Sequence, residues 1–187
     1  VVSRITDQKG FDLMKQQVYD TWVMDKIMEL DVQFVILGTG EKEYEDMFKY
    51  FANKYKKRVC AFLTFNEPLA QKIYACSDIF LMPSLFEPCG LGQLIAMRYG
   101  TIPVVRKTGG LKDTVIHYNS QTKEGTGFEF EDCSGYWMYK KIEEAYNYYN
   151  VKGQEDFKQM QHNGMNAGFS WDDAAKKYER VYHSLVR

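Results

Sequence analysis

A glutamate and two glycines occur together in residues 83–92 of this chain. An apolar run at residues 79–82 precedes them and an amphipathic stretch at 94–99 follows, so we expect a strand, a loop and a helix in that order. Ligands of open α/β sheets bind at the carboxyl edge of the strands, and free N–H groups at a helix start attract anions. Glu87 adds a carboxylate that can accept hydrogen bonds from hydroxyl groups. The segment therefore has the groups that a sugar attached to a phosphate requires.

Three further loops, which we expect at the same sheet edge, carry cations or glycines. They contain Arg4 and Lys9, Gly38-Thr39-Gly40, and Thr108-Gly109-Gly110. Because arginine and lysine bind phosphate oxygens and glycine lets backbone amides approach them closely, we interpret the four loops together as a pocket for a sugar diphosphate. Each loop alone has an ordinary alternative, namely surface cations or a plain strand-to-helix turn.

Other candidate side chains also have alternatives. Phe65 and Tyr74 could offer ring surfaces to a base, although aromatic residues are more often part of the core. Glu87 could be a solvated loop acid. Cys89 has no neighbouring base marked in the sequence, so we do not expect it to be a nucleophile.

The elements that must position these loops alternate along the chain. Apolar runs typical of buried parallel strands occur at residues 32–37, 59–63, 79–82, 102–105 and 125–130. Helical patterns or helix signals occur at 11–30, 44–55, after Asn66, and at 91–99, 108–116, 139–149, 155–165 and 172–185. The alternation predicts an α/β fold with a doubly wound parallel sheet and helices on both faces. Residues 1–187 would form a single domain.

Composition excludes several classes of protein. The 187 residues are 45% apolar and 16% aromatic, enough for a core, and the formal charge of -1 gives no field that attracts nucleic acid or a membrane. No apolar run approaches the roughly 20 residues that span a bilayer. The four cysteines lack Cys-x-x-Cys spacing, so we expect neither a disulfide scaffold nor a zinc site, and a reducing, cytoplasmic setting fits best. Residues 1–4 are typical of the interior of a strand, so we expect a preceding part of the protein to be missing.

Several segments resemble, in order, the C-terminal domain of bacterial glycogen synthases and plant starch synthases. They are residues 3–13 (SRITDQKGFDL), 86–91 (FEPCGL), 93–94 (QL), 97–101 (MRYGT), 106–115 (RKTGGLKDTV), 125–128 (GTGF) and 169–171 (FSW). Such enzymes are retaining glucosyltransferases with two Rossmann-like domains in the GT-B arrangement. The resemblance implies that this chain is the C-terminal domain, which binds most of the ADP-glucose donor.

The resemblance also assigns residues to the site. It implies that Arg4 and Lys9 hold the diphosphate, and that Glu87 hydrogen-bonds glucose hydroxyls. Around these three catalytic residues, the implied substrate-binding residues are Gly38 and Thr39 near the nucleoside, Phe65 against the base, Cys89 and Gly90 at the hexose, and Leu91 and Gly92 at the distal phosphate, together with Tyr74, Gly109 and Gly110.

This chain departs from the family pattern at two positions. Gly92 stands where relatives have threonine or serine, and Leu85 replaces an arginine that is common there. Ile95 occupies the place of the second acid of the Glu-x7-Glu pattern in other retaining transferases, as a nonacidic residue does throughout this family. The departures at Gly92 and Leu85 favour an alternative, a nucleotide-sugar-binding module without catalysis. A second alternative is a UDP-sugar transferase of the sucrose synthase type.

The implied reaction is transfer of an α-glucosyl unit to the 4-hydroxyl end of an α-1,4-glucan, with release of ADP. We expect no metal or other cofactor, because Arg4, Lys9 and the helix start would neutralise the leaving diphosphate and the chain has no Asp-x-Asp pair. The glucan would bind through the missing N-terminal domain, so this fragment alone would bind nucleotide weakly and transfer little glucose. The rings of the last helix would belong either to the core or to a contact with that domain. The location would be the bacterial cytoplasm, or the plastid in a plant.

Overall fold

Five parallel strands form the centre of the protein in the computed structural model, which describes residues 1–152 and 154–186. β3 (Phe34–Leu37) pairs with β4 (Val59–Phe62). β5 (Ile79–Met82), β6 (Ile102–Arg106) and β7 (Phe128–Phe130) form a second ladder in that order. All five are short apolar runs, and each falls within one residue of, or inside, a run that the sequence predicts.

The first five residues lie beside β3 as two isolated parallel bridges rather than as a full strand. Ser3 N–H donates to Leu37 O at 3.1 Å, and Ile5 N–H donates to Thr39 O at 2.9 Å. The same segment lines a small hollow with the end of β5. It therefore lies between β3 and the end of β5.

Helices follow most of the strands. They are the short 3-10 turns η1 (Asp7–Lys9) and η2 (Phe11–Lys15), the helices α1 (Val23–Glu29), α2 (Lys42–Lys54), α3 (Glu67–Cys76), α4 (Gly92–Arg98), α5 (Gly109–Thr114) and α6 (Gly135–Asn147), the π-helical turn η3 (Tyr148–Lys152), and α7 (Gln154–Met165) and α8 (Trp171–Leu185). The predicted N-cap of α3 is present, because Asn66 Oδ1 accepts from Leu69 N–H at 2.9 Å.

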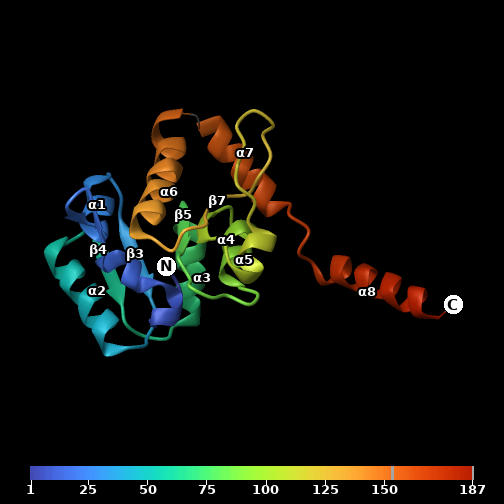
Figure 1. The fold of residues 1–187 in the computed structure, drawn as a ribbon, viewed down its shortest axis with the longest axis horizontal. Helices are drawn as coiled ribbons and strands as arrows, with labels where there is room; N and C mark the ends of the chain where they lie inside the picture. The colour runs from blue at the N-terminus through green and yellow to red at the C-terminus, as the bar shows by residue number, and fades with distance from the viewer. Residues whose placement is uncertain (153, 187) are drawn as a thin grey trace.

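The helices cover the sheet on both faces (Figure 1). α6 packs on β6, β7 and α1, whereas α4 packs on β5 and β6 and against α3, α5 and α7. Residues 102–105 of β6 are all buried, so this strand must be covered on both sides. The predicted doubly wound α/β fold is confirmed.

One predicted helix is interrupted. Instead of a helix over residues 11–30, the chain forms η2, a hairpin of β1 (Gln17–Val18) and β2 (Thr21–Trp22), and then α1. Tyr19 and Asp20 have φ angles of 52° and 61°, the left-handed conformation that a two-residue hairpin turn requires. The apolar spacing was misleading because the tight turns still place residues such as Val18 in the core.

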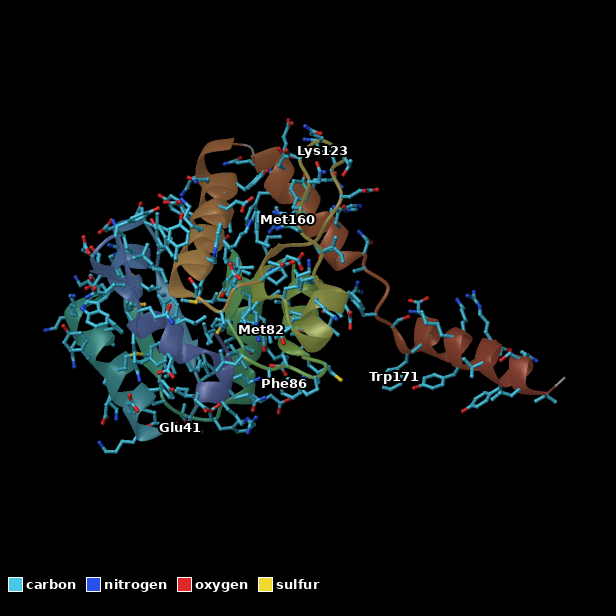
Figure 2. All side chains as sticks on the ribbon, in the orientation of Figure 1. Glu41, Met82, Phe86, Lys123, Met160 and Trp171 are labelled. Carbon is cyan, nitrogen blue, oxygen red and sulfur yellow. The ribbon has the colours of Figure 1, made fainter. Side chains whose placement is uncertain are left out.

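α8 projects away from the rest of the molecule (Figures 1 and 2). Ser170 caps its start, since Ser170 Oγ accepts from Asp173 N–H at 3.2 Å. None of the described residues of α8 is buried, and Trp171 at its start is 86% exposed. The core alternative for the rings of this helix is therefore wrong. In the described part of the chain, no helix has the length and apolarity to cross a membrane.

Candidate functional site

The side chains of Lys9 and Glu87 form an ion pair at the carboxyl edge of the sheet. Lys9 Nζ contacts Glu87 Oε2, and Ser84 Oγ lies 3.3 Å from the same oxygen. The Lys9 and Glu87 side chains are only 15% and 12% exposed. The predicted solvated-acid alternative for Glu87 is therefore wrong, because a cation and a hydroxyl hold its carboxylate in a largely shielded place.

Gln8 connects Arg4 to the same loop. Its Oε1 lies 3.4 Å from Arg4 Nη2, and its Nε2 donates to Phe86 O at 3.0 Å. Its backbone oxygen accepts from Leu85 N–H at 2.8 Å. The predicted cations Arg4 and Lys9 thus flank the residue that joins their loop to the loop of Glu87, and the three predicted catalytic residues share one region.

The carboxyl end of β3 lies at this edge as well. Figure 2 shows Glu41, which follows β3, and Phe86, which follows β5, along the same border of the molecule. Glu41 Oε1 accepts from Asp7 N–H at 3.2 Å, so this loop also contacts the segment that carries Lys9.

The glycines that begin α5 allow the fourth loop to pack directly on the loop of Glu87. A Cβ atom on Gly109, whose φ is +46°, would lie 2.0 Å from Glu87 O, and one on Gly110 would lie 2.2 Å from Cys89 O. Gly110 N–H donates to Glu87 O at 3.0 Å. Close approach of two backbones explains these glycines, and it places them beside Glu87 as the sequence predicts.

Four consecutive backbone amides of the Glu87 loop are free in the described part of the chain. The N–H groups of Cys89, Gly90, Leu91 and Gly92 donate to no protein acceptor there. Leu91 is 70% exposed and Cys89 is also exposed, so these amides belong to a surface segment. A row of unpaired N–H groups next to Lys9 is suited to an anion.

Gly38-Thr39-Gly40 is held mainly by the first residues of the chain. A Cβ atom on Gly38 would lie 1.8 Å from Ser3 O, and one on Gly40 would lie 1.9 Å from Ile5 O. Thr39 is exposed, and among the described residues its only hydrogen bond is the one that its carbonyl accepts from Ile5 N–H. The glycines are therefore required by strand packing, and the exposed Thr39 remains available to a ligand.

The two predicted ring surfaces lie in different environments. Phe65, between β4 and α3, is 86% exposed. Tyr74 is 5% exposed and packs on Phe80, and burial raises the pKa of Tyr74 to about 12. A Cβ atom on Gly92 would lie 3.3 Å from Tyr74 Oη. Phe65 is therefore a free ring, whereas Tyr74 is a core residue whose hydroxyl reaches the start of α4.

The hollow beside Lys9 is too small to enclose a sugar diphosphate. The hollow that Lys9 and Ser84 line has room for about 10 Å³, roughly one water molecule. A larger hollow of about 540 Å³ lies elsewhere, between α4 and the segment that leads to α8, and is lined by Leu94, Ile95, Arg98, Tyr99, Gly164, Ala167, Phe169 and Ser170.

Sequence reasoning did not give a role to two polar side chains that hold the Glu87 loop, the partly buried Arg106 and the buried Gln93. Arg106 Nε donates to Ser84 O at 2.9 Å, and Arg106 Nη2 contacts Leu85 O. Gln93, on α4, donates to carbonyls of the same loop. The role of Gln93 could have been recognised from the sequence. Gln93 shares the helical spacing of Ala96 and Met97, and this spacing places a polar residue on the core face of α4.

A shielded carboxylate, two cations and a row of free amides lie together at the carboxyl edge of a parallel sheet, where open α/β folds bind ligands. The family of glycosyl transferases group 1 matches residues 1–164 of this chain. The chain belongs to this family, and its fold is the Rossmann-like α/β domain of GT-B glycosyltransferases.

Within the family, the chain is similar to glycogen and starch synthases. It is 53% identical over 187 residues to the glycogen synthase of Streptococcus mutans and 48% identical over 186 residues to that of Clostridium novyi. The catalytic domain of starch synthase IV from Arabidopsis thaliana, solved with ADP and acarbose bound, matches with a TM-score of 0.81 and 36% identity over 98% of this chain. The chain spans 38%, 37% and 37% of the lengths of these three proteins. The predicted family is confirmed.

Proposed function

We propose that this chain is the C-terminal, donor-binding domain of a glycogen synthase. In that role it would bind ADP-glucose for transfer of an α-glucosyl unit to the 4-hydroxyl end of an α-1,4-glucan. The observation that carries the proposal is the Lys9–Glu87 pair beside four free amides, in a chain 53% identical to a glycogen synthase. An anion-binding cation and a hydroxyl-binding carboxylate in contact fit a hexose joined directly to a diphosphate.

When the donor binds, the two residues of the ion pair would contact different parts of it. Lys9 Nζ turns to the diphosphate oxygens together with Arg4, and Glu87 accepts hydrogen bonds from the hexose hydroxyls. The bond between the anomeric carbon and the phosphate oxygen then breaks, and negative charge develops on the diphosphate. Preorganised cations and amides stabilise that charge, so no metal is required for this step.

The configuration at the anomeric carbon would be retained by attack from the front face. The acceptor 4-hydroxyl oxygen forms the new bond to the anomeric carbon, and its proton passes to the departing phosphate oxygen. No protein nucleophile takes part in this scheme. A glucosyl adduct trapped on this chain, detected by intact mass, would contradict it.

We assign the base site from side-chain exposure and the acceptor site from the length of the relatives. The exposed ring of Phe65 would stack on adenine, with Thr39 near the ribose. The glucan would bind to an N-terminal domain, which is consistent with relatives that are more than twice as long as this chain. We place the enzyme in the cytoplasm of a bacterium, or in the plastid if the source is a plant.

The test is an activity assay of the full-length protein with ADP-glucose and glycogen. We expect incorporation of glucose, with ADP-glucose preferred over UDP-glucose, and tighter binding of ADP than of UDP by calorimetry. Binding without transfer would support the non-catalytic module instead, and a preference for UDP would support an enzyme of the sucrose synthase type. The isolated 187-residue chain should bind nucleotide weakly and transfer little glucose, so robust elongation by it would contradict the role of a second domain.

A further inference from the structure

Gln93 is a polar side chain in a place where an apolar one would be expected. It is 0% exposed and lies on the core face of α4 with Ala96 and Met97. Its Nε2 group donates to Cys89 O at 3.2 Å, to Gly90 O at 2.9 Å and to Thr114 Oγ1 at 3.1 Å. The amide of Gln93 therefore holds two consecutive carbonyls of the Glu87 loop and connects them to α5.

Holding these two carbonyls fixes the direction of two N–H groups. In a trans peptide the C=O bond and the following N–H bond point in opposite directions, and no cis peptide occurs in the described residues. Because Cys89 O and Gly90 O point inward to the buried Gln93, the N–H groups of Gly90 and Leu91 point outward. These are two of the four amides that have no acceptor in the described part of the protein.

Core packing alone does not account for this arrangement. Gln93 Oε1 is buried and has no hydrogen-bond partner within the described residues. A buried oxygen without a partner destabilises the folded state, and an apolar side chain of the same length would avoid that loss. Thr114, which accepts from Gln93, donates in turn to Gly110 O at 2.7 Å, so the contacts converge on the loop backbone.

We propose that Gln93 is a positioning residue that aims the N–H groups of Gly90 and Leu91 at the donor. The N–H of Gly90 is directed to the hexose and the N–H of Leu91 to the distal phosphate. This inference rests on the proposed function, because it assumes a nucleoside diphosphate sugar at the loop.

The experiment measures what the second phosphate contributes to binding. AMP and ADP are titrated separately by calorimetry into the full-length protein and into its variant Gln93→Met, which keeps the side-chain length and removes the amide. We expect the ratio of the dissociation constants of AMP and ADP to fall about tenfold in the variant, because AMP lacks the distal phosphate. In the transfer assay we expect kcat to fall at least tenfold and the KM for glycogen to stay unchanged.

Gln161→Met is the matched control. Gln161 is a partly buried glutamine whose Nε2 likewise donates to a carbonyl, Gly100 O at 2.7 Å, but it lies on α7 outside the loop. This control should keep the AMP to ADP ratio of the wild type. Equal weakening of AMP and ADP in Gln93→Met, or an unchanged ratio, would overturn the proposal.

Two further outcomes are decisive. If Gln93→Met does not fold, Gln93→Glu, which has the same shape, is measured in the same way; failure of both to fold would assign Gln93 to the core alone and overturn the proposal. If the wild-type protein binds neither ADP nor ADP-glucose, the proposed function fails first and this inference falls with it. A wild type that binds ADP and transfers glucose, with an unaltered Gln93→Met variant, would overturn only the role of Gln93.

Discussion

Lys9 and Glu87 are 78 positions apart in the sequence, yet Lys9 Nζ and Glu87 Oε2 are in direct contact. Both side chains are mostly shielded from solvent. The contact joins the first loop of the chain to the loop after β5, and it brings a phosphate-binding type of side chain next to a hydroxyl-binding one. The predictions below begin with this pair.

Replacing Glu87 with glutamine should reduce transfer and leave the fold intact. The variant keeps the size of the side chain but removes the charge that accepts from sugar hydroxyls. A hydrogen bond to a charged group contributes about 1.5–3 kcal/mol, so we expect kcat to fall roughly 10- to 150-fold. Initial rates of the full-length protein with ADP-glucose and glycogen measure this. The control is Glu43→Gln, which breaks the more exposed Lys15–Glu43 pair and should leave the rate unchanged.

Replacing Lys9 with methionine should weaken ADP binding and destabilise the fold. The variant removes a cation from the diphosphate and leaves the shielded Glu87 carboxylate without its partner. In a double-mutant cycle, Lys9→Met and Glu87→Gln should therefore be non-additive by about 1–3 kcal/mol in the free energy of unfolding. Denaturant unfolding of the wild type, both single variants and the double variant gives the coupling. Additive effects would mean that the two side chains act independently.

Gly109→Ala should move the loop of Glu87. The new methyl group would lie 2.0 Å from Glu87 O on a residue with φ of +46°, so either the loop or the helix α5 must shift. We expect a loss of about 2–4 kcal/mol in the free energy of unfolding, together with a loss of transfer activity. Gly168→Ala is a suitable comparison, because the nearest atom to its methyl group would be a carboxylate oxygen of Asp173, which can move. Wild-type stability of Gly109→Ala would show that the two backbones are farther apart than described.

Glu144 should make stability depend on pH in the acid range. Burial alone would raise the pKa of Glu144, but hydrogen bonds from His117 and Lys141 lower it from 4.5 to about 2. Glu144 therefore stabilises the fold above pH 4.5, and this contribution disappears as the pH falls toward 2. Since the side chain is 34% exposed, we expect only about 1–2 kcal/mol. Thermal unfolding of wild type and Glu144→Gln from pH 7 to pH 3 should show a difference that shrinks below pH 4.5, and a constant difference would contradict the assignment.

Ending the isolated chain after Gly168 should leave the stability of the rest unchanged. None of the described residues of α8 is buried, so its removal takes no side chain out of the core. We expect a change of less than about 0.5 kcal/mol in the free energy of unfolding and a reduced helical signal in circular dichroism. A fall of several degrees in the melting temperature would show that α8 packs on the body of the isolated chain.

Local sequence patterns were sufficient for much of the fold. The N-cap at Asn66 and the cap pair of Ser170 and Asp173 depend on contacts between near neighbours, which the sequence order already contains. The strand at residues 79–82 pairs with the distant β6, but its continuous apolar run is visible in the sequence. The helix over residues 11–30 was predicted wrongly because periodicity records which residues are buried, and both a helix and a tight hairpin can bury Val18.

The sequence by itself determined the fold class, the family and the four loops that meet at one sheet edge, because strand–helix alternation and short motifs can be recognised in the order of the residues. Only the tertiary structure decided that Lys9 contacts Glu87, that Phe65 is exposed while Tyr74 is buried, and that Gln93 holds the loop carbonyls. The physical reason is that these contacts join residues from different elements, and their geometry depends on how closely whole backbones pack.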